Sequence, residues 1–435
     1  MSDLKARPLA QVVYRIPFLE SVLFFVLFSG PPSFRHRDSQ ASLYGEMDAA
    51  VVFQLAVWLA AGLWLCYRLW ELRANSTFWN RFSSTHKIAL ILIVLLGTST
   101  FVSLAPALTA VKVYQIVVEM LFCWTFLQLY GLETCLSKIF WASAFLCIVI
   151  GVLAVLSPDS VWDFAEGALP RLRGGSIVGT NSVSAFAIIL LVTNPRPISR
   201  VSFATALALF AVLQFLSLTR TSWMALAIIF LVAAIQRPKI RGLKWIYGAL
   251  TLGVVALLAG GLTLISQVRD PDSIYDLSNR VGLWSYMSDT VIHESPWLGL
   301  GYTAATRTLG AEFDPDLAAG HSIFVDVFIG GGFISLAVFL ALFTRLGYYS
   351  VRLLRFSKNA RVFAVCSLFL YVLIMGAVGE TIDTSPFGFT FWMVASMLPM
   401  LIASQRRKNA AQGISSPDVL TPSPNRGAKI NIALP

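Results

Sequence analysis

Three basic residues in the second half of the chain, Arg220, Arg280 and His321, could together carry out group transfer from a phosphorylated donor. The planar guanidinium of arginine donates paired hydrogen bonds to phosphate oxygens and stays charged at physiological pH. Histidine has an ordinary pKa of about 6.5, so it can accept a proton close to neutrality. If the three side chains meet, the arginines could hold a pyrophosphate leaving group while the histidine deprotonates an attacking hydroxyl.

Each of these residues also has a plainer interpretation. Arg220 lies in a short connection between apolar segments and could reach out to lipid phosphate. Arg280 could be a solvated charge or could pair with Asp276, one helical turn earlier. His321 could simply cap the entry of a helix. The functional hypothesis therefore depends on the combination, and it predicts that the three side chains converge.

Metal-dependent chemistry has little support in the sequence. The stretches Asp270–Asp272 and Asp314–Asp316 imitate a metal-binding pair of acids, but a proline between two acids is typical of a turn. The four histidines show no ligand spacing, and the sequence contains no Walker motif or nucleotide-binding fingerprint. We therefore expect neither a metal ion nor a cofactor.

The elements that must position these residues are membrane-spanning helices. Of the 435 residues, 57% are hydrophobic and only 13% are charged, and the mean hydropathy is +0.72. A soluble domain has about 25% charged residues, so a soluble enzyme is excluded. A spanning helix needs about 20 mostly apolar residues. About twelve segments qualify: Phe18–Gly30, Ala49–Leu69, Ile88–Leu108, Ala110–Tyr130, Ser137–Leu156, Ile177–Thr193, Val201–Ser217, Ser222–Ile235, Leu243–Ile265, Ile323–Phe343, Val362–Gly379 and Phe387–Ala403.

The distribution of basic residues orients these segments. Most of the 33 lysines and arginines fall in alternate connections if the N-terminus is cytoplasmic, as the positive-inside rule requires. We therefore predict a multi-pass membrane protein with both termini in the cytoplasm. The net charge of +10 follows from this bias and indicates no nucleic-acid partner. The five cysteines lie in or beside apolar segments and are expected to pack as small hydrophobic residues.

The predicted layout has five parts. Residues 1–17 form a cytoplasmic N-terminus, 18–265 hold the first nine spans, 266–322 form one large outer loop, 323–403 hold the last three spans, and 404–435 form a disordered cytoplasmic tail. A connection longer than about 12–15 residues usually has a function. The outer connections Ser157–Ser176 and Ser266–Ser322 are both longer than that, so we expect the site on the outer face.

Four segments resemble the O-antigen ligase and polymerase family of bacterial inner-membrane glycan transferases. They are Gly174–Ala187, Ser217–Ala225, Arg280–Gly301 with its Pro-Trp-Leu-Gly-Leu-Gly ending, and His321–Gly332, and their order and spacing match. The resemblance implies an all-α polytopic fold similar to the lipid-dependent (GT-C type) glycosyltransferases. It also implies a bacterial inner membrane location, with the 266–322 loop in the periplasm.

The same resemblance implies transfer of a glycan from undecaprenyl pyrophosphate to an acceptor hydroxyl, with inversion and without a metal ion. The acceptor would be another glycan for a polymerase or lipid A-core for a ligase, with membrane lipids as the surrounding partners. Arg220 and Arg280 match the arginines expected to hold the pyrophosphate, and His321 matches the candidate base.

The resemblance and the neighbouring sequence also suggest substrate-binding residues. Asn181 matches an asparagine of the sixth-span motif, and Arg173 lies in the outer connection that precedes it. Trp284 could stack on the face of a sugar. Asp326 resembles the acid found in exopolysaccharide polymerases, whereas Gly330 stands where the family often has an acid.

Several functions remain open on the sequence alone. Asp326 favours a polymerase slightly over a ligase, and glycan transfer onto protein is a third possibility. The competing class is a transporter or flippase of lipid-linked or polyanionic substrates. A transporter predicts inverted repeats and polar groups near the middle of the membrane, and the sequence has neither pattern. A structural or signalling membrane protein is disfavoured by the placement of the arginines and the histidine.

Overall fold

The structure, a computed structural model of the 435-residue chain, is that of an all-α polytopic membrane protein. It describes residues 17–30, 49–163, 170–174, 179–193, 199–236, 280–314, 320–379, 382 and 385–411. The predicted ninth span Leu243–Ile265, nearly all of the N-terminal segment and the first part of the large loop lie outside the described residues. The same holds for the predicted tail beyond Ala411.

Six of the described helices are long and apolar enough to cross a membrane. They are α3 (Ala49–Leu72), α5 (Ser84–Thr98, continued by the 3-10 turn η1, Ser99–Val102), α6 (Pro106–Leu156), α14 (Ile323–Phe356), α15 (Ala360–Val378) and α16 (Phe387–Ala411). Four shorter apolar helices are α1 (Phe18–Ser29), α7 (Thr180–Thr193), α8 (Arg200–Leu216) and α9 (Arg220–Gln236). Each of these helices overlaps at least one span predicted from the sequence.

Proline and glycine explain two of the differences between the observed and the predicted boundaries. The predicted third span Ile88–Leu108 extends too far, because Pro106 begins α6: proline lacks an N–H group and suits the first turn of a helix. The predicted fourth and fifth spans, Ala110–Tyr130 and Ser137–Leu156, are joined in α6, which bends at Gly131 (φ 78°, ψ 171°). The bend divides α6 into two apolar arms that correspond to those two spans.

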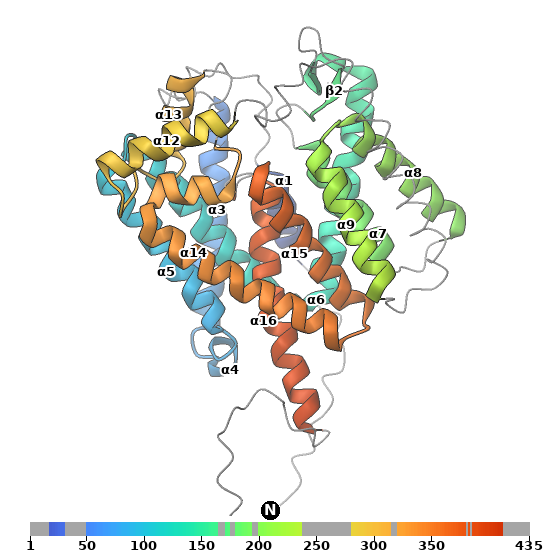
Figure 1. The fold of residues 1–435 in the computed structure, drawn as a ribbon. Coiled ribbons are helices and arrows are strands. Elements are labelled where there is room, and N and C mark those ends of the chain that lie inside the picture. The colour runs from blue at the N-terminus through green and yellow to red at the C-terminus, as the bar shows by residue number, and fades with distance from the viewer. Residues whose placement is uncertain are drawn as a thin grey trace, which may run out of the picture.

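The segments of the two outer connections lie together at one end of the molecule (Figure 1). Helices α12 (Arg280–Glu294) and α13 (Ala304–Phe313) lie there, as do the short antiparallel strands β1 (Trp162–Asp163) and β2 (Arg171–Leu172). The short helix α4 (Ser76–Trp79) and the C-terminal end of α16 lie at the opposite end. We call these two ends the α12 face and the α4 face.

The first span contains an acid, Glu20, that is compensated by a neighbouring helix. Glu20 is buried, and its Oε1 accepts a hydrogen bond from Arg68 Nε on α3 at 2.9 Å. Arg68 also pairs with Glu71 at 2.6 Å. A charge inside a membrane is tolerated when it is paired, so this ion pair explains how so short an apolar segment can include a carboxylate.

A glycine-rich contact fixes a second bent helix, α14, which runs beyond the predicted end of its span and bends at Gly332. The segment Pro296–Tyr302 lies across this bend. Leu300 N donates to Ile329 O at 2.9 Å, and Phe333 N donates to Pro296 O at 2.9 Å. A bend leaves helix N–H and C=O groups without intrahelical partners, and the 296–302 segment supplies them.

We expect Gly299→Ala and Gly332→Ala each to destabilise the protein by about 1–3 kcal/mol. Both glycines have positive φ values, 70° and 65°. A Cβ on Gly299 would lie 2.5 Å from the carbonyl carbon of Gly330, so the two backbones would have to separate. Gly347→Ala in α14 is the matched control, because nothing lies within 4 Å of a Cβ added at Gly347.

Thermal unfolding in detergent measures the effect. We expect the first two variants to unfold at lower temperature and Gly347→Ala to unfold at or above the wild-type temperature. Equal unfolding temperatures for all three variants would contradict the close packing of the two glycine segments.

Candidate functional site

His321 lies in the short turn that leads into α14 at the α12 face. Its backbone has a positive φ of 50°, which is uncommon for a residue with a side chain. Ser322 follows it as the N-cap of α14, and the first stretch of that helix ends at the Gly332 bend. The imidazole is therefore held by a tight turn in front of a short helical segment, and the 296–302 segment anchors the far end of that segment.

Two arginines from different connections act on His321. Burial is the largest cause that lowers the pKa of His321, and the positive charges of Arg280 and Arg173 lower the pKa further, to about 4. Arg280 begins α12, whereas Arg173 follows β2. Both arginine charges therefore act on His321, and the imidazole is neutral at pH 7 and able to accept a proton. The predicted convergence of Arg220, Arg280 and His321 stays a prediction.

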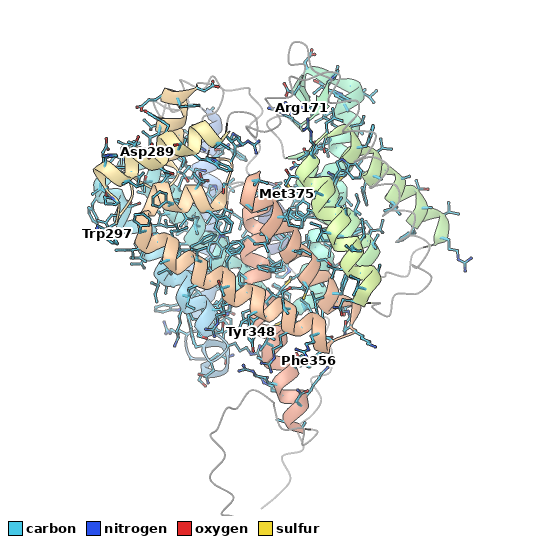
Figure 2. The ribbon with its side chains drawn as sticks, viewed as in Figure 1. Arg171, Asp289, Trp297, Tyr348, Phe356 and Met375 are labelled. Atoms are coloured by element: carbon cyan, nitrogen blue, oxygen red, sulfur yellow. The ribbon has the colours of Figure 1, made fainter. Side chains whose placement is uncertain are left out.

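Each of the two arginines is fixed by a further contact. Arg280 Nη1 donates a hydrogen bond to the main-chain oxygen of Val378 at the end of α15. Arg173 Nε lies 3.0 Å from Asp163 Oδ2, and Arg171 Nη2 lies 3.1 Å from the same oxygen. Figure 2 shows Arg171 at the α12 face beside the strands. Since one carboxylate is shared by two guanidinium groups, the region keeps a net positive charge suited to an anion.

Trp284 and Asp326 both contact the backbone just before His321. The indole Nε1 of Trp284 donates to Gly320 O at 2.7 Å. Asp326 is buried in the first turn of α14, and a Cβ on Gly320 would collide with its Oδ1. These two predicted substrate-binding residues therefore lie beside the histidine turn, and both help to fix its conformation.

Arg220 and Asn181 lie on α9 and α7, which both pack against α15. Arg220 is exposed and begins α9, and Asn181 lies in the first turn of α7. Asn181 O accepts a hydrogen bond from Tyr371 OH at 3.1 Å, which ties α7 to α15. The structure thus groups Arg173, Arg280, His321, Trp284 and Asp326 directly, whereas Arg220 and Asn181 are connected to this group through α15.

Sequence reasoning missed the residues that hold these side chains in place. Gln214 and Tyr371 are polar residues within apolar spans, and that contrast is the signal that could have identified them. The pairing of Asp163 with Arg171 and Arg173 left no signal beyond charge in a loop. The carbonyl of Val378 left none, because a main-chain acceptor has no sequence signature.

Among the described residues, no group of three or more His, Cys, Asp or Glu side chains is arranged to hold a metal ion. All five cysteines are free thiols, and four of them, Cys123, Cys135, Cys147 and Cys366, are buried as expected for small hydrophobic residues. The predicted independence from metals stays a prediction that a chelator can test.

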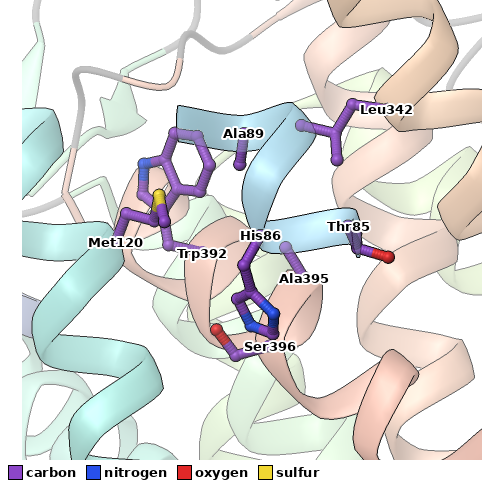
Figure 3. Close-up of a pocket in the computed structure, with 8 residues that line it drawn as sticks. All are labelled: Thr85, His86, Ala89, Met120, Leu342, Trp392, Ala395 and Ser396. Carbon is purple, nitrogen blue, oxygen red and sulfur yellow. The ribbon is translucent and has the colours of Figure 1, made fainter. Parts of the chain in front are cut away.

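A small pocket lies far from this site, where α5, α6, α14 and α16 meet near the α4 face (Figure 3). It is lined by Thr85, His86, Ala89, Met120, Leu342, Trp392, Ala395 and Ser396. Its empty volume is about 190 Å³, but none of that space is wide enough for a water molecule. The pocket is therefore a packing defect, and it offers no place for a substrate.

The comparison with known families finds a match that covers most of the candidate site residues. Residues 203–340 match the O-antigen ligase family. The matched region begins in α8 and ends in α14, so it contains Arg220, Arg280, Trp284, His321 and Asp326, while Arg173 and Asn181 precede it. No curated protein matches the chain. The resemblance expected from the sequence is thus confirmed over this region.

Proposed function

Starting from the O-antigen ligase match over residues 203–340, we propose that this protein is a membrane glycan transferase. It moves a glycan from undecaprenyl pyrophosphate to an acceptor hydroxyl at the periplasmic face of a bacterial inner membrane. The observation that carries the proposal is the position of His321 before α14, where Trp284 and Asp326 lie against the preceding Gly320 and the charges of Arg280 and Arg173 act on the imidazole. The reaction requires positive charge that binds a polyanionic leaving group, and it requires a proton acceptor. The two arginines supply the first and His321 supplies the second.

The proposed topology has twelve spans with both termini in the cytoplasm. The described helices supply most of these spans, and the two arms of α6 count separately. Basic side chains support the orientation: Arg352, Arg355 and Arg361 lie near the junction of α14 and α15, and Phe356 at that junction is on the side of the molecule away from α12 (Figure 2). By the positive-inside rule the α4 face is then cytoplasmic and the α12 face periplasmic.

The proposed mechanism uses charge and proton transfer in one displacement. Arg173 adds to the positive charge that binds the pyrophosphate. As the bond from the anomeric carbon to the pyrophosphate oxygen breaks, Arg220 and Arg280 stabilise the charge that builds on the leaving group. The acceptor oxygen forms the new glycosidic bond and loses its proton to His321. Binding of the pyrophosphate offsets the arginine charges, so the pKa of His321 rises from about 4 toward its ordinary value as the donor binds.

A polymerase is slightly favoured over a ligase because Asp326 resembles the acid found in exopolysaccharide polymerases. Asp326 is buried next to the histidine turn, where it could orient an acceptor sugar. The distribution of polar groups supports an enzyme over a transporter. The site residues gather at one face, whereas a transporter would hold its substrate near the middle of the membrane.

The test is glycan transfer by the purified protein in liposomes. The donor is an undecaprenyl-pyrophosphate-linked repeat unit, supplied with a chelator and with or without lipid A-core. Longer lipid-linked glycans without added core indicate a polymerase, and product only on lipid A-core indicates a ligase. Absence of transfer to either acceptor from correctly inserted protein, tested with its native donor, would overturn the proposed function and favour the transporter class.

A further inference from the structure

A closed ring of buried hydrogen bonds joins four helices next to Arg220. Ser184 Oγ on α7 donates to Gln214 Oε1 on α8 at 2.7 Å, and Gln214 Nε2 donates to Ser222 Oγ on α9 at 2.9 Å. Ser222 Oγ lies 2.9 Å from Tyr371 OH on α15, which donates to Asn181 O on α7 at 3.1 Å. The ring therefore starts and ends on α7, and all four of its side chains are fully buried.

From Gln214 to Asn181 the donors and acceptors fit one direction, whereas the single Ser184 proton is shared between Gln214 Oε1 and Thr180 O, which lies at 2.6 Å. Tyr371 OH uses its proton on Asn181 O, so Ser222 Oγ donates to Tyr371 and itself accepts from Gln214 Nε2. Removing one member leaves a neighbouring polar group buried without a partner, and in an apolar interior such a group is costly. The ring thus fixes the relative positions of the helices that it joins.

Arg220 lies between two contacts of Gln214. Ser222, two residues after Arg220, accepts from the Gln214 amide, and Ser217, three residues before it, donates from its Oγ to Gln214 O at 2.7 Å. The intervening turn is tight, with a φ of 49° at Leu218. Arg220 follows this turn directly, so the turn fixes the position from which its exposed side chain extends. The Gln214 amide, through Ser222, helps to fix the first turn of α9.

The same ring relates Arg220 to Arg280 through α15. Tyr371 holds the start of α9, and the carbonyl of Val378 on the same helix accepts from Arg280 Nη1. The two anchors are seven residues apart, which corresponds to about 10 Å along a helix. Helix α15 thus contacts both the first turn of α9, where Arg220 lies, and Arg280 itself.

We propose that Gln214, Ser222 and Tyr371 are positioning residues that hold Arg220 in register with Arg280 for one pyrophosphate group. This inference rests on the proposed function, because it assigns the ring to the same donor site. The three residues touch no reacting atom, and they act through the first turn of α9.

A double-mutant cycle tests the proposal. Tyr371→Phe removes only the hydroxyl. The aromatic side chain at position 371 keeps its edge contact with Phe186, at 5.3 Å between ring centroids. We expect kcat/KM for the donor to fall about tenfold in the wild-type background. In an Arg220→Lys background, which has already lost the paired hydrogen bonds of the guanidinium, we expect Tyr371→Phe to change kcat/KM by less than about twofold.

Tyr349→Phe is the matched control. The Tyr349 hydroxyl accepts from Arg345 Nε at 2.9 Å on α14, outside the ring. Like Tyr371→Phe, the Tyr349→Phe variant loses a hydroxyl oxygen and a hydrogen bond. We therefore expect its unfolding temperature to fall while its kcat/KM stays at the wild-type value. A tenfold loss for Tyr371→Phe in both backgrounds, or no loss in either, overturns the positioning role.

Binding of undecaprenyl pyrophosphate separates this inference from the proposed function, because binding needs no transfer. We expect Tyr371→Phe to weaken binding about tenfold in the wild-type background and not in the Arg220→Lys background. If the wild type transfers no glycan but this coupling in binding is present, the inference stands and the proposed function fails. If transfer is present and neither rate nor binding shows coupling, the inference fails alone.

Discussion

Replacing His321 with alanine is expected to lower kcat for glycan transfer by about 10²- to 10⁴-fold, the usual contribution of a general base. The structure gives the reason: the imidazole is held in a turn at the α12 face, where burial and the charges of two arginines keep it neutral. Because His321 acts on the acceptor proton and not on the bound pyrophosphate, KM for the donor should change by less than about threefold. Initial rates at saturating acceptor, with the donor concentration varied around KM, measure both quantities.

His293→Ala is the matched control for this prediction. His293 lies on α12 near the same face, is exposed, and its Nδ1 lies 2.7 Å from the main-chain oxygen of Asp289. It therefore has the same chemistry without the enclosing arginines, and its replacement should leave kcat unchanged. Equal losses for the two variants, or full activity in His321→Ala, would show that His321 is not the base.

Replacing Arg280 with methionine is expected to lower kcat/KM for the donor by about 10²- to 10³-fold, as for the removal of one preorganised group that stabilises developing charge. The same change removes a positive charge that lowers the pKa of His321. Methionine keeps much of the apolar length of the side chain, so the loss reports the charge and hydrogen bonds of the guanidinium. Arg307→Met on α13 is the control at the same face, and it should retain wild-type kcat/KM.

The pH dependence of kcat/KM distinguishes this explanation from a general disturbance. A base must be unprotonated in the free enzyme, so wild-type kcat/KM should be constant at neutral pH and fall as the pH drops through about 4, the pKa of His321. Without the Arg280 charge this pKa rises, and the fall begins at a higher pH. It does not reach the ordinary value, because burial is the larger cause and remains. An unchanged acid limb in Arg280→Met would contradict the contact between the two charges.

The spanning helices could be predicted because a membrane span leaves a long apolar segment, whatever its neighbours are. The bends could not be placed in the same way. Gly131 interrupts α6 only in its backbone angles, and the apolar pattern on both sides of it continues. Pro106 carried a usable signal, since proline favours a helix start, and weighing it would have corrected the end of the third span.

The glycines of α14 show how far a motif can be interpreted without its partner. Gly330–Gly332 lies inside a predicted span, where glycines commonly allow close packing between helices. The glycines do serve packing, but the partner is the 296–302 segment, whose own Gly299 is needed for the same close approach. The resemblance had grouped both segments by function, and the structure gives them a shared mechanical role in supporting the helix that begins after His321.

The site itself was only partly predictable. Arg280 and His321 stood out because charged residues near apolar segments are few. The ring through Tyr371 did not, because its hydrogen bonds join residues 149 and 190 positions apart, and a single chain carries no record of such distant pairs. The stacking role predicted for Trp284 stays a prediction, and the structure adds its hydrogen bond to Gly320.

The central claim is that Arg173, Arg280 and His321 belong to one site that holds a lipid-linked pyrophosphate. The most direct measurement is the affinity of the purified, reconstituted protein for undecaprenyl pyrophosphate in the presence of a chelator. The account predicts binding to the wild type, binding weakened at least about tenfold in Arg280→Met and in Arg173→Met, and unchanged binding in Arg307→Met. Equal affinity in all four proteins, or binding that disappears when the chelator is added, would contradict it.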